Sequence, residues 1–177
     1  IEFDLLDIDI HEMEDDDVVA YLENNRYDLF LTGSIVTHYK WMKWLTKQIR
    51  QINPNAMIVV GNSVAGSIPD LFLKNSDADI AVMGEGEISC GELVLRILKE
   101  ECWEGLSGIA FKRNGANTIQ INERRKSLKK LDEFPMINWD MFDTEKYFGK
   151  SYALAKSIDG NDVRVMPVVT ARGCAFR

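Results

Sequence analysis

The stretch that decides the fold is Ala56–Ser63, AMIVVGNS, in which an apolar run ends at a glycine followed by small polar residues. The apolar positions Met57–Val60 leave no polar face, so this segment is predicted to be a β-strand covered on both sides. Such strands are typical of a parallel sheet flanked by helices. The sequence therefore predicts an α/β domain built around this strand.

The same pattern occurs twice more, in Asp28–Ser34 (DLFLTGS) and in Asp79–Glu87 (DIAVMGEGE). Segments with helical periodicity separate the three predicted strands. Strands joined by helical crossovers run parallel, because each crossover is right-handed and returns the chain to the same edge. We therefore expect Gly33, Gly61 and Gly84 to lie along one edge of the sheet.

Open α/β sheets bind ligands at the carboxyl ends of their strands. Glycine at those ends lets a bulky ligand approach the backbone, and small polar side chains add hydrogen-bond donors and acceptors. Side chains of this kind here are Ser34, Thr37, Asn62 and Ser63. A single glycine at a strand end often serves only the turn. Three at corresponding positions favour a ligand site.

Further elements are predicted before and after these strands. Phe3–Ile10 (FDLLDIDI) is predicted as a strand, and Glu12–Asn25 as a helix with an acidic first turn. Gly108–Lys112 and Thr118–Asn122 flank the dipeptide Asn114-Gly115, which is typical of a hairpin. The fold class expected is a doubly wound, mostly parallel α/β sheet with an antiparallel hairpin at one edge.

Two groups of residues have more than one interpretation. The helix predicted to end near Ile52 has an apolar stripe, and its aromatic members suit either a flat cofactor or, more commonly, the cover of a sheet. The members of this stripe are Trp41, Trp44, Leu45, Ile49 and Ile52. Glu85 and Glu87 resemble a catalytic carboxylate pair, but acidic side chains at a helix N-terminus are stabilising without any chemistry.

Composition narrows the function classes. The chain has 177 residues and 46% hydrophobic content, which suits one domain with an appendage and a real core. A net charge of −7 argues against a nucleic-acid partner. The basic cluster Arg124–Lys130 is interpreted as a solvated linker, because Asp132 and Glu133 follow it at once. No apolar run reaches the roughly 20 residues that span a bilayer, so we expect no membrane segment and a cytoplasmic location.

The C-terminal third changes character. Glu123–Tyr147 is charged with scattered apolar anchors, whereas Val163–Thr170 (VRVMPVVT) repeats the buried-strand pattern. We expect an α/β domain at 1–122, a connector at 123–162 that lies on another surface, and the first strand of a further domain at 163–177. The widely spaced Cys90, Cys102 and Cys174 do not have the pattern of a disulfide framework.

Together these pieces resemble the N-terminal half of cobalamin-dependent radical S-adenosylmethionine (SAM) enzymes over nearly the whole chain. LFLTGSIVT (29–37), IVVGNSVA (58–65) and DIAVMGEGE (79–87) resemble the family's third-strand segment, fourth-strand turn and fifth-strand ending. LKKLDEFPMINWDMFDTEKYF (128–148) is similar to its connector. VVTARGCAFR (168–177) looks like the first barrel strand leading into the cluster motif C-x3-C-x2-C.

This resemblance implies a flavodoxin-like, Rossmann-like B12-binding fold that feeds a radical SAM barrel in the same polypeptide. The cofactors implied are cobalamin, S-adenosylmethionine and a [4Fe–4S] cluster, with Cys174 as the first cluster ligand. The activity implied is that of a methyltransferase or a related C–C or C–S bond-forming enzyme. The cofactor-binding residues implied are Thr32, Gly33, Ser34, Ile35, Val36, Thr37, Gly61, Asn62, Ser63, Ala65, Gly84, Glu85, Gly86 and Glu87. Because one thiolate cannot hold a cluster, residues 1–177 alone are not expected to be catalytic.

The sequence departs from the family at several points. Asn62 stands where a second glycine is usual, and Ser63-Val64 where Pro-His is frequent. The D-x-H-x-x-G motif is absent, and its usual place precedes the second strand, where the resemblance places Ile1. We therefore expect a piece of a longer polypeptide, or another element in the slot of the first strand. His38 near the predicted edge suits either cobalt or, more simply, a surface or capping role.

Two alternatives remain beside the cobalamin-binding interpretation. A corrin-free α/β binding or interaction domain of a radical SAM protein is favoured by the departures at Asn62 and Ser63. A nucleotide-binding Rossmann or receiver domain is the weaker alternative, because no G-x-G-x-x-G follows a strand and no G-x-x-x-x-G-K-[ST] occurs.

Overall fold

The computed structural model describes residues 2–33, 35–113, 118–127, 132, 134–149 and 160 of the chain. Two compact units form, one of Val19–Glu133 and the other of Ile1–Val18 with Phe134–Arg177. None of the helices in the described ranges has both the length and the apolar character of a membrane span. The predicted barrel strand at 163–177, with Cys174, lies outside the described residues.

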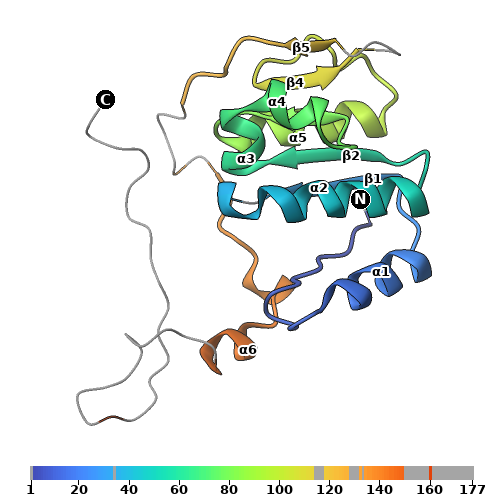
Figure 1. The fold of residues 1–177 in the computed structure, drawn as a ribbon. Coiled ribbons are helices and arrows are strands. Elements are labelled where there is room, and N and C mark those ends of the chain that lie inside the picture. Colours follow the sequence, from blue (N-terminus) through green and yellow to red (C-terminus); the bar gives the residue numbers. More distant parts are fainter. Residues whose placement is uncertain are drawn as a thin grey trace. The chain divides into compact units, whose positions relative to one another are not determined.

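The larger unit is organised around a five-stranded sheet whose strands follow sequence order (Figure 1). The strands are β1 (Leu29–Gly33), β2 (Met57–Gly61), β3 (Ile80–Val82), β4 (Ile109–Lys112) and β5 (Ile119–Ile121). The pairs β1–β2 and β2–β3 are parallel, whereas β4 is antiparallel to both β3 and β5. The predicted α/β architecture with parallel strands and an antiparallel hairpin at one edge is confirmed.

Helices connect the parallel strands. They are the short 3-10 turn η1 (Val36–His38), α2 (Tyr39–Ile52), α3 (Asn62–Ser67), α4 (Pro69–Lys74) and α5 (Gly86–Leu98). The first two lie between β1 and β2, the next two between β2 and β3, and α5 follows β3. Because β1–β3 run parallel with helical connections, their carboxyl ends meet at the same edge.

The centre of the core is β2. Ile58, Val59 and Val60 are 0%, 2% and 0% exposed, so the strand is covered on both faces as predicted. Neighbouring residues on a strand point to opposite faces. Val59 packs in a cluster that contains Leu93 of α5, which places α5 on one face and leaves Ile58 and Val60 on the other.

The buried stripe of α2 differs from the predicted one. Its buried residues are Met42, Leu45, Thr46 and Ile49. Trp41 and Trp44 are only half-buried and lie beside this stripe, with their rings 5.8 Å apart. Thr46 takes a core position because its hydroxyl donates to the Lys43 carbonyl and accepts from Asp77 N.

Arg50 holds the amino-terminal edge of the sheet. Its Nη1 donates to the carbonyls of Pro54 and Ala56 at 2.8 and 2.7 Å. Its Nη2 pairs with Asp79 Oδ2 at 2.6 Å, and the same oxygen accepts from Ile58 N at 2.7 Å. One guanidinium thus joins the end of α2 to the residues that precede β2 and β3.

Lys112, at the end of β4, adds a contact at this amino-terminal edge. Its Nζ donates to the Ser76 carbonyl at 2.7 Å. Burial lowers the pKa of Lys112, while the charges of Asp79 and Asp77 oppose that shift. Burial therefore outweighs the two carboxylates, and the ammonium group of Lys112 loses its proton more readily than that of an exposed lysine.

The predicted strand at Phe3–Ile10 is wrong. The segment is irregular and ends in turns, with His11 N bonded to the Asp7 carbonyl and Met13 N to the Ile8 carbonyl. Alternating apolar residues form a strand only where a neighbouring strand satisfies the backbone. In the described part of the chain β1 pairs only with β2, and no partner strand for residues 3–10 is present there.

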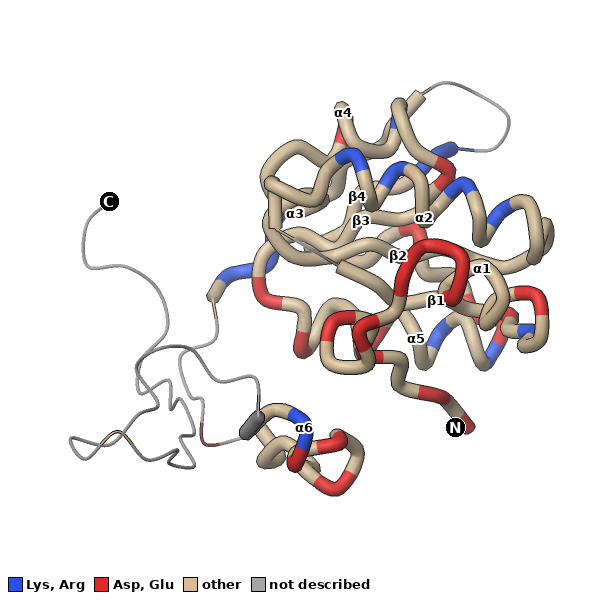
Figure 2. Tube along the Cα trace, turned by 60° about the horizontal axis from the view of Figure 1, so that its bottom comes forward, with Lys and Arg blue, Asp and Glu red and all other residues tan. Residues whose placement is uncertain are grey.

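The smaller unit joins the N-terminal segment to a distant part of the sequence. It contains the 3-10 turn η3 (Trp139–Met141) and α6 (Thr144–Gly149), while α1 (Asp15–Asn24) begins in this unit and ends in the larger one. The Tyr147 hydroxyl donates to the Asp7 carboxylate, and Lys146 Nζ lies 3.0 Å from His11 Nδ1. Acidic residues recur along this N-terminal segment and the first turn of α1 (Figure 2).

Candidate functional site

The ends of β1 and β2 form a pair of glycines. Gly33 and Gly61 are partners in the parallel register. A Cβ on Gly33 would lie 3.2 Å from the carbonyl carbon and oxygen of Gly61, so a side chain there would require the strands to move apart by a few tenths of an ångström. A Cβ on Gly61 would meet no atom within 4 Å, and its backbone is extended. The Gly61 side of this edge is therefore open.

The end of β3 carries the third predicted glycine. Gly84 is exposed and has φ +77°, in the left-handed region that favours glycine. Gly66 of α3 packs against this turn, and a Cβ on Gly66 would lie 3.5 Å from Gly84 N. Gly33, Gly61 and Gly84 therefore lie at one edge of the sheet, as the sequence predicted.

Apolar and polar side chains lie at the end of β1 and just after it. Thr32, within β1, is half-buried, while Thr37, in η1, is exposed. Ile35 and Val36 are 51% and 61% exposed, which is high for large apolar side chains. The predicted Ser34 lies outside the described residues. An apolar surface therefore borders the glycine pair.

The residues after β2 form a helix where the sequence indicated a turn, because α3 begins at Asn62 itself. Asn62 is exposed, has φ +63°, and its Oδ1 accepts from Ser63 N at 2.6 Å. Asparagine tolerates this conformation better than most residues. Ser63 is half-buried and Ala65 is fully buried, so Ala65 is part of the core beneath the edge and is not exposed on it.

Glu85 and Glu87 lie at the start of α5. Glu85 is at the N-cap position with a side chain that makes no capping hydrogen bond, and Glu87 is exposed in the first turn. Gly86 between them is half-buried. Among the described residues no group of three or more His, Cys, Asp or Glu side chains is placed to hold a metal.

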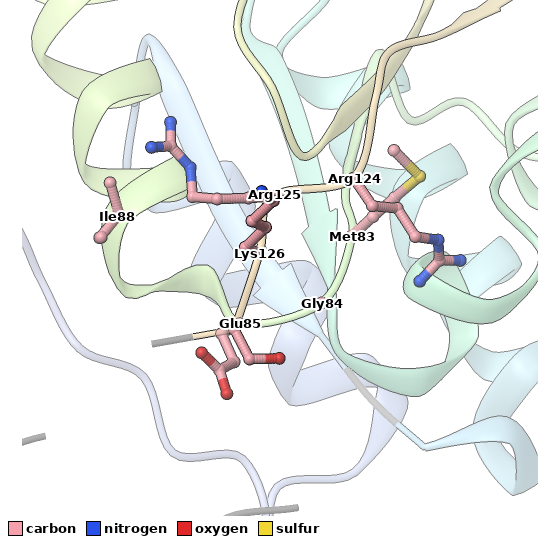
Figure 3. Close-up of a pocket in the computed structure, with 8 residues that line it drawn as sticks. Met83, Gly84, Glu85, Ile88, Arg124, Arg125 and Lys126 are labelled. Carbon is pink, nitrogen blue, oxygen red and sulfur yellow. The ribbon is translucent and has the colours of Figure 1, made fainter. Parts of the chain in front are cut away.

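Arg124 and Arg125, part of the predicted solvated linker, contact this edge instead. Arg124 Nη2 donates to the Gly66 carbonyl in α3 at 2.7 Å. Arg125 Nε donates to Ser89 Oγ at 3.2 Å, and its Nη2 pairs with Glu92 in α5. Figure 3 shows the two side chains extending to opposite sides of the segment. The linker interpretation is therefore wrong for Arg124 and Arg125.

The continuation of the hairpin explains these arginine contacts. Gly108 N donates to the Glu123 carbonyl at 2.8 Å, which carries the β4–β5 pairing past the end of β5. Adjacent residues of an extended segment point to opposite sides. Arg124 therefore reaches α3 while Arg125 reaches α5. Continuing the strand alternation of Thr118–Asn122 into residues 123–125 would have predicted that these two arginines point to opposite sides.

A hollow of about 260 Å³ lies between the turn after β3 and residues 124–127. Its lining includes Met83, Glu85, Ile88, Arg124, Lys126 and Ser127 (Figure 3). Ligand pockets for whole small molecules are typically about 300–1,000 Å³. This hollow is therefore slightly smaller than a typical pocket for a whole small molecule.

A mixed α/β sheet with glycines at the carboxyl ends of its parallel strands defines the class of open-sheet ligand-binding domains. Within that class, residues 1–94, more than half of the chain, match the B12 binding domain family. The chain belongs to this family.

Relatives extend well beyond the region of similarity. An uncharacterized methyltransferase of Pyrococcus horikoshii is 29% identical over 133 residues, which are 75% of this chain and 26% of that protein. An uncharacterized protein of Methanocaldococcus jannaschii is 30% identical over 106 residues, which are 60% of this chain and 20% of that protein. The chain thus spans about a quarter or less of the curated relatives that it matches.

Solved structures with a similar fold include the radical S-adenosylmethionine methyltransferase TsrM from Kitasatospora setae. Its complex with tryptophan and a SAM analogue gives a TM-score of 0.58 at 16% identity, covering 68% of this chain and 24% of TsrM. Its complex with cobalamin and a [4Fe–4S] cluster gives 0.58 at 15% identity, covering 71% and 24%. At such identities the likeness is one of fold.

Proposed function

We propose that this chain is the cobalamin-binding module of a radical SAM enzyme of the methyltransferase type. The observation that carries the proposal is the glycine edge in a chain of the B12 binding domain family. The sequence motifs 29–37, 58–65 and 79–87 end at that edge. In this proposal the substrate is bound by the barrel and not by the residues of this chain.

The residues of the edge fit a corrin. A broad, flat macrocycle needs bare backbone to lie on, and Gly61 and Gly84 each leave open space where a side chain would stand. Ile35 and Val36 offer apolar surface to the ring. Asn62 and Thr37 add exposed hydrogen-bonding groups beside the glycines.

Bound cobalamin would supply a cobalt centre able to carry a methyl group. The residues of this chain would bind and orient the ring, and Ile35 and Val36 would exclude water from one side of it. Acid–base chemistry is not required of the edge, because the cofactor performs the difficult step. Glu85 and Glu87 therefore act in binding and at the helix start in this proposal.

For the whole protein we propose a radical SAM barrel in the same polypeptide, with a [4Fe–4S] cluster and S-adenosylmethionine. Cys174 would be the first cluster ligand, as the motif resemblance implies. Thiolate-held clusters suit a reducing compartment, so a cytoplasmic location belongs to the same proposal.

Retention of hydroxocobalamin tests the proposed function. The full chain is mixed with excess hydroxocobalamin, freed of unbound corrinoid by gel filtration, and examined by visible absorbance. We expect a coloured complex close to one corrinoid per chain. A colourless protein after saturation would support the corrin-free binding domain, which the Asn62 turn with its bond to Ser63 N favours.

A further inference from the structure

The hollow beside Gly84 is held by the fold itself. On one side Arg124 is bonded to the Gly66 carbonyl, and on the other Arg125 is bonded to Ser89 and Glu92. Behind it the packing is tight, because a Cβ on Gly108 would lie 2.4 Å from Ser89 Oγ. Its walls are therefore supported by contacts to two helices and to the β4–β5 hairpin.

The volume limits what the hollow can accept. At about 260 Å³ it has the volume of roughly nine water molecules at the liquid value of about 30 Å³ each. A corrin ring is far larger than this. Each of the ring's peripheral side arms is a short alkyl chain with a polar end, which the space accommodates.

The lining combines hydrogen-bond acceptors, donors and apolar groups. Glu85 supplies a carboxylate, while Lys126 and Ser127 supply an ammonium and a hydroxyl group. Met83 and Ile88 supply apolar surface. A primary carboxamide offers two N–H donors and a carbonyl acceptor, so it matches acceptor and donors together.

An anionic group matches the same lining less well. Glu85 would repel a phosphate or carboxylate that entered. The guanidinium group of Arg125 is paired with Glu92, and that of Arg124 donates to a backbone carbonyl. A carboxamide is favoured over a carboxylate because its N–H groups can donate to Glu85, which a carboxylate cannot do, while the ammonium of Lys126 would attract an anion.

We propose that this hollow, named here the arm pocket, receives one peripheral carboxamide arm of the corrin ring. Glu85 accepts a hydrogen bond from the amide nitrogen, and Lys126 or Ser127 donates to the amide oxygen. The proposal rests on the proposed function, because the ring must lie on the glycine edge for an arm to enter.

The test uses cobalamin and its monocarboxylic acids, in each of which one carboxamide arm has been hydrolysed to a carboxylate. Dissociation constants are measured by the change in visible absorbance at pH 8. We expect the full chain to bind one of these acids at least ten-fold more weakly than cobalamin, and more weakly than the other acids. The acid with the largest loss identifies the arm.

Variants assign that discrimination to the arm pocket. Glu85→Gln removes the repelling charge at nearly constant volume, so the gap between cobalamin and the disfavoured acid should shrink by at least three-fold. Lys126→Ala should weaken cobalamin binding several-fold. Glu101→Gln and Lys99→Ala are the matched controls, because both residues are exposed beyond the end of α5.

Each outcome has a distinct meaning. If all acids bind within two-fold of cobalamin, or if Glu85→Gln and Glu101→Gln leave the same gap, the arm pocket is wrong while cobalamin binding stands. If the unmodified chain retains no cobalamin, the proposed function fails and the arm pocket fails with it. Circular dichroism of each variant confirms that it is folded.

Discussion

The carboxyl edge of the sheet has two ends that differ in how they are built. At the open end, Gly33 and Gly61 are followed by the exposed Ile35 and Val36. At the strapped end, residues 83–88, which join β3 to the start of α5, lie beside residues 124–127, whose arginines are hydrogen-bonded to α3 and α5. One end presents bare backbone and apolar surface, and the other presents charged groups held in place.

This difference separates two tasks that a large amphipathic ligand imposes on a protein. A flat ring requires a surface without side chains, so most residues larger than glycine would block it at these positions. Polar arms require fixed donors and acceptors, because an unmatched polar group loses its bonds to water. The open end serves the first task and the strapped end the second.

The largest effect is expected from filling the open end. Gly61→Phe places a ring in space that is free within 4 Å of the Cβ, on extended backbone that any residue adopts. We expect cobalamin binding to weaken by more than ten-fold, which is about 1.4 kcal/mol, with little change in melting temperature. Titration of hydroxocobalamin and thermal denaturation measure the two effects.

The matched control for this change is Gly91→Phe. Gly91 is exposed on α5, and its Cβ would also meet no atom within 4 Å. It should bind cobalamin as the unmodified chain does. Equal binding by Gly61→Phe and Gly91→Phe would show that the ring does not lie at the open end.

A second comparison measures how an alanine at Gly84 and one at Gly61 each change the free energy of unfolding. Gly84→Ala forces a side chain into the left-handed region and should destabilise the domain by about 1–2 kcal/mol. Gly61→Ala should be neutral or stabilise by up to about 1 kcal/mol, because it restricts only the unfolded chain. Urea denaturation of both variants gives the difference. Equal stabilities would contradict the strain assigned to Gly84.

Removing the arginines tests how the strapped end is held. Arg124→Ala and Arg125→Ala should each cost about 1 kcal/mol in unfolding free energy. The loss at Arg125 should shrink in high salt, because its partner Glu92 is charged and both side chains are partly exposed. The loss at Arg124 should not, because its partner is a neutral carbonyl.

The control for the arginine variants is Arg113→Ala, since Arg113 is exposed at the end of β4. Denaturation at low and high ionic strength compares the three variants. The same salt response at Arg124 and Arg125 would argue against the assigned partners.

The smallest effect concerns the thiol of Cys90, next to Ser89. Burial raises the pKa of Cys90, so less thiolate forms at pH 8 and alkylation should be slower than at the exposed Cys102. Arg125→Ala releases Ser89 and should accelerate alkylation of Cys90 several-fold. The folded protein is treated with iodoacetamide and then digested, and mass spectrometry of the peptides resolves the two sites. An unchanged Cys90 rate in Arg125→Ala would show that Arg125 does not restrain the start of α5.

The sequence predicted those features that depend on local pattern. The apolar run at Met57–Gly61 and the glycines that end the strands follow from periodicity and backbone chemistry, so the edge was predictable. The strand at 3–10 was wrong because strand formation depends on a partner that local pattern cannot supply.

Features that depend on tertiary contacts were missed. Asn62–Ser67 (NSVAGS) contains few strong helix formers, yet it is helical where Gly66 packs against the Gly84 turn. The roles of Arg124 and Arg125 depend on where the hairpin delivers the chain. The arm pocket needs two segments, 83–88 and 124–127, that lie far apart in the sequence, which no local motif encodes.

The contacts of Arg50 at the amino-terminal edge of the sheet have a consequence for the carboxyl edge. Its guanidinium bonds to the Ala56 carbonyl before β2 and to Asp79 before β3, and Asp79 in turn accepts from Ile58 N. Sliding β2 by one residue against β3 would break the bond from Ile58 N to Asp79, and Arg50 could not keep its contacts with both Ala56 and Asp79. Contacts at the amino-terminal ends of β2 and β3 therefore fix the positions of Gly61 and Gly84 relative to each other at the carboxyl ends. A shift of one residue would displace them by about 3.3 Å.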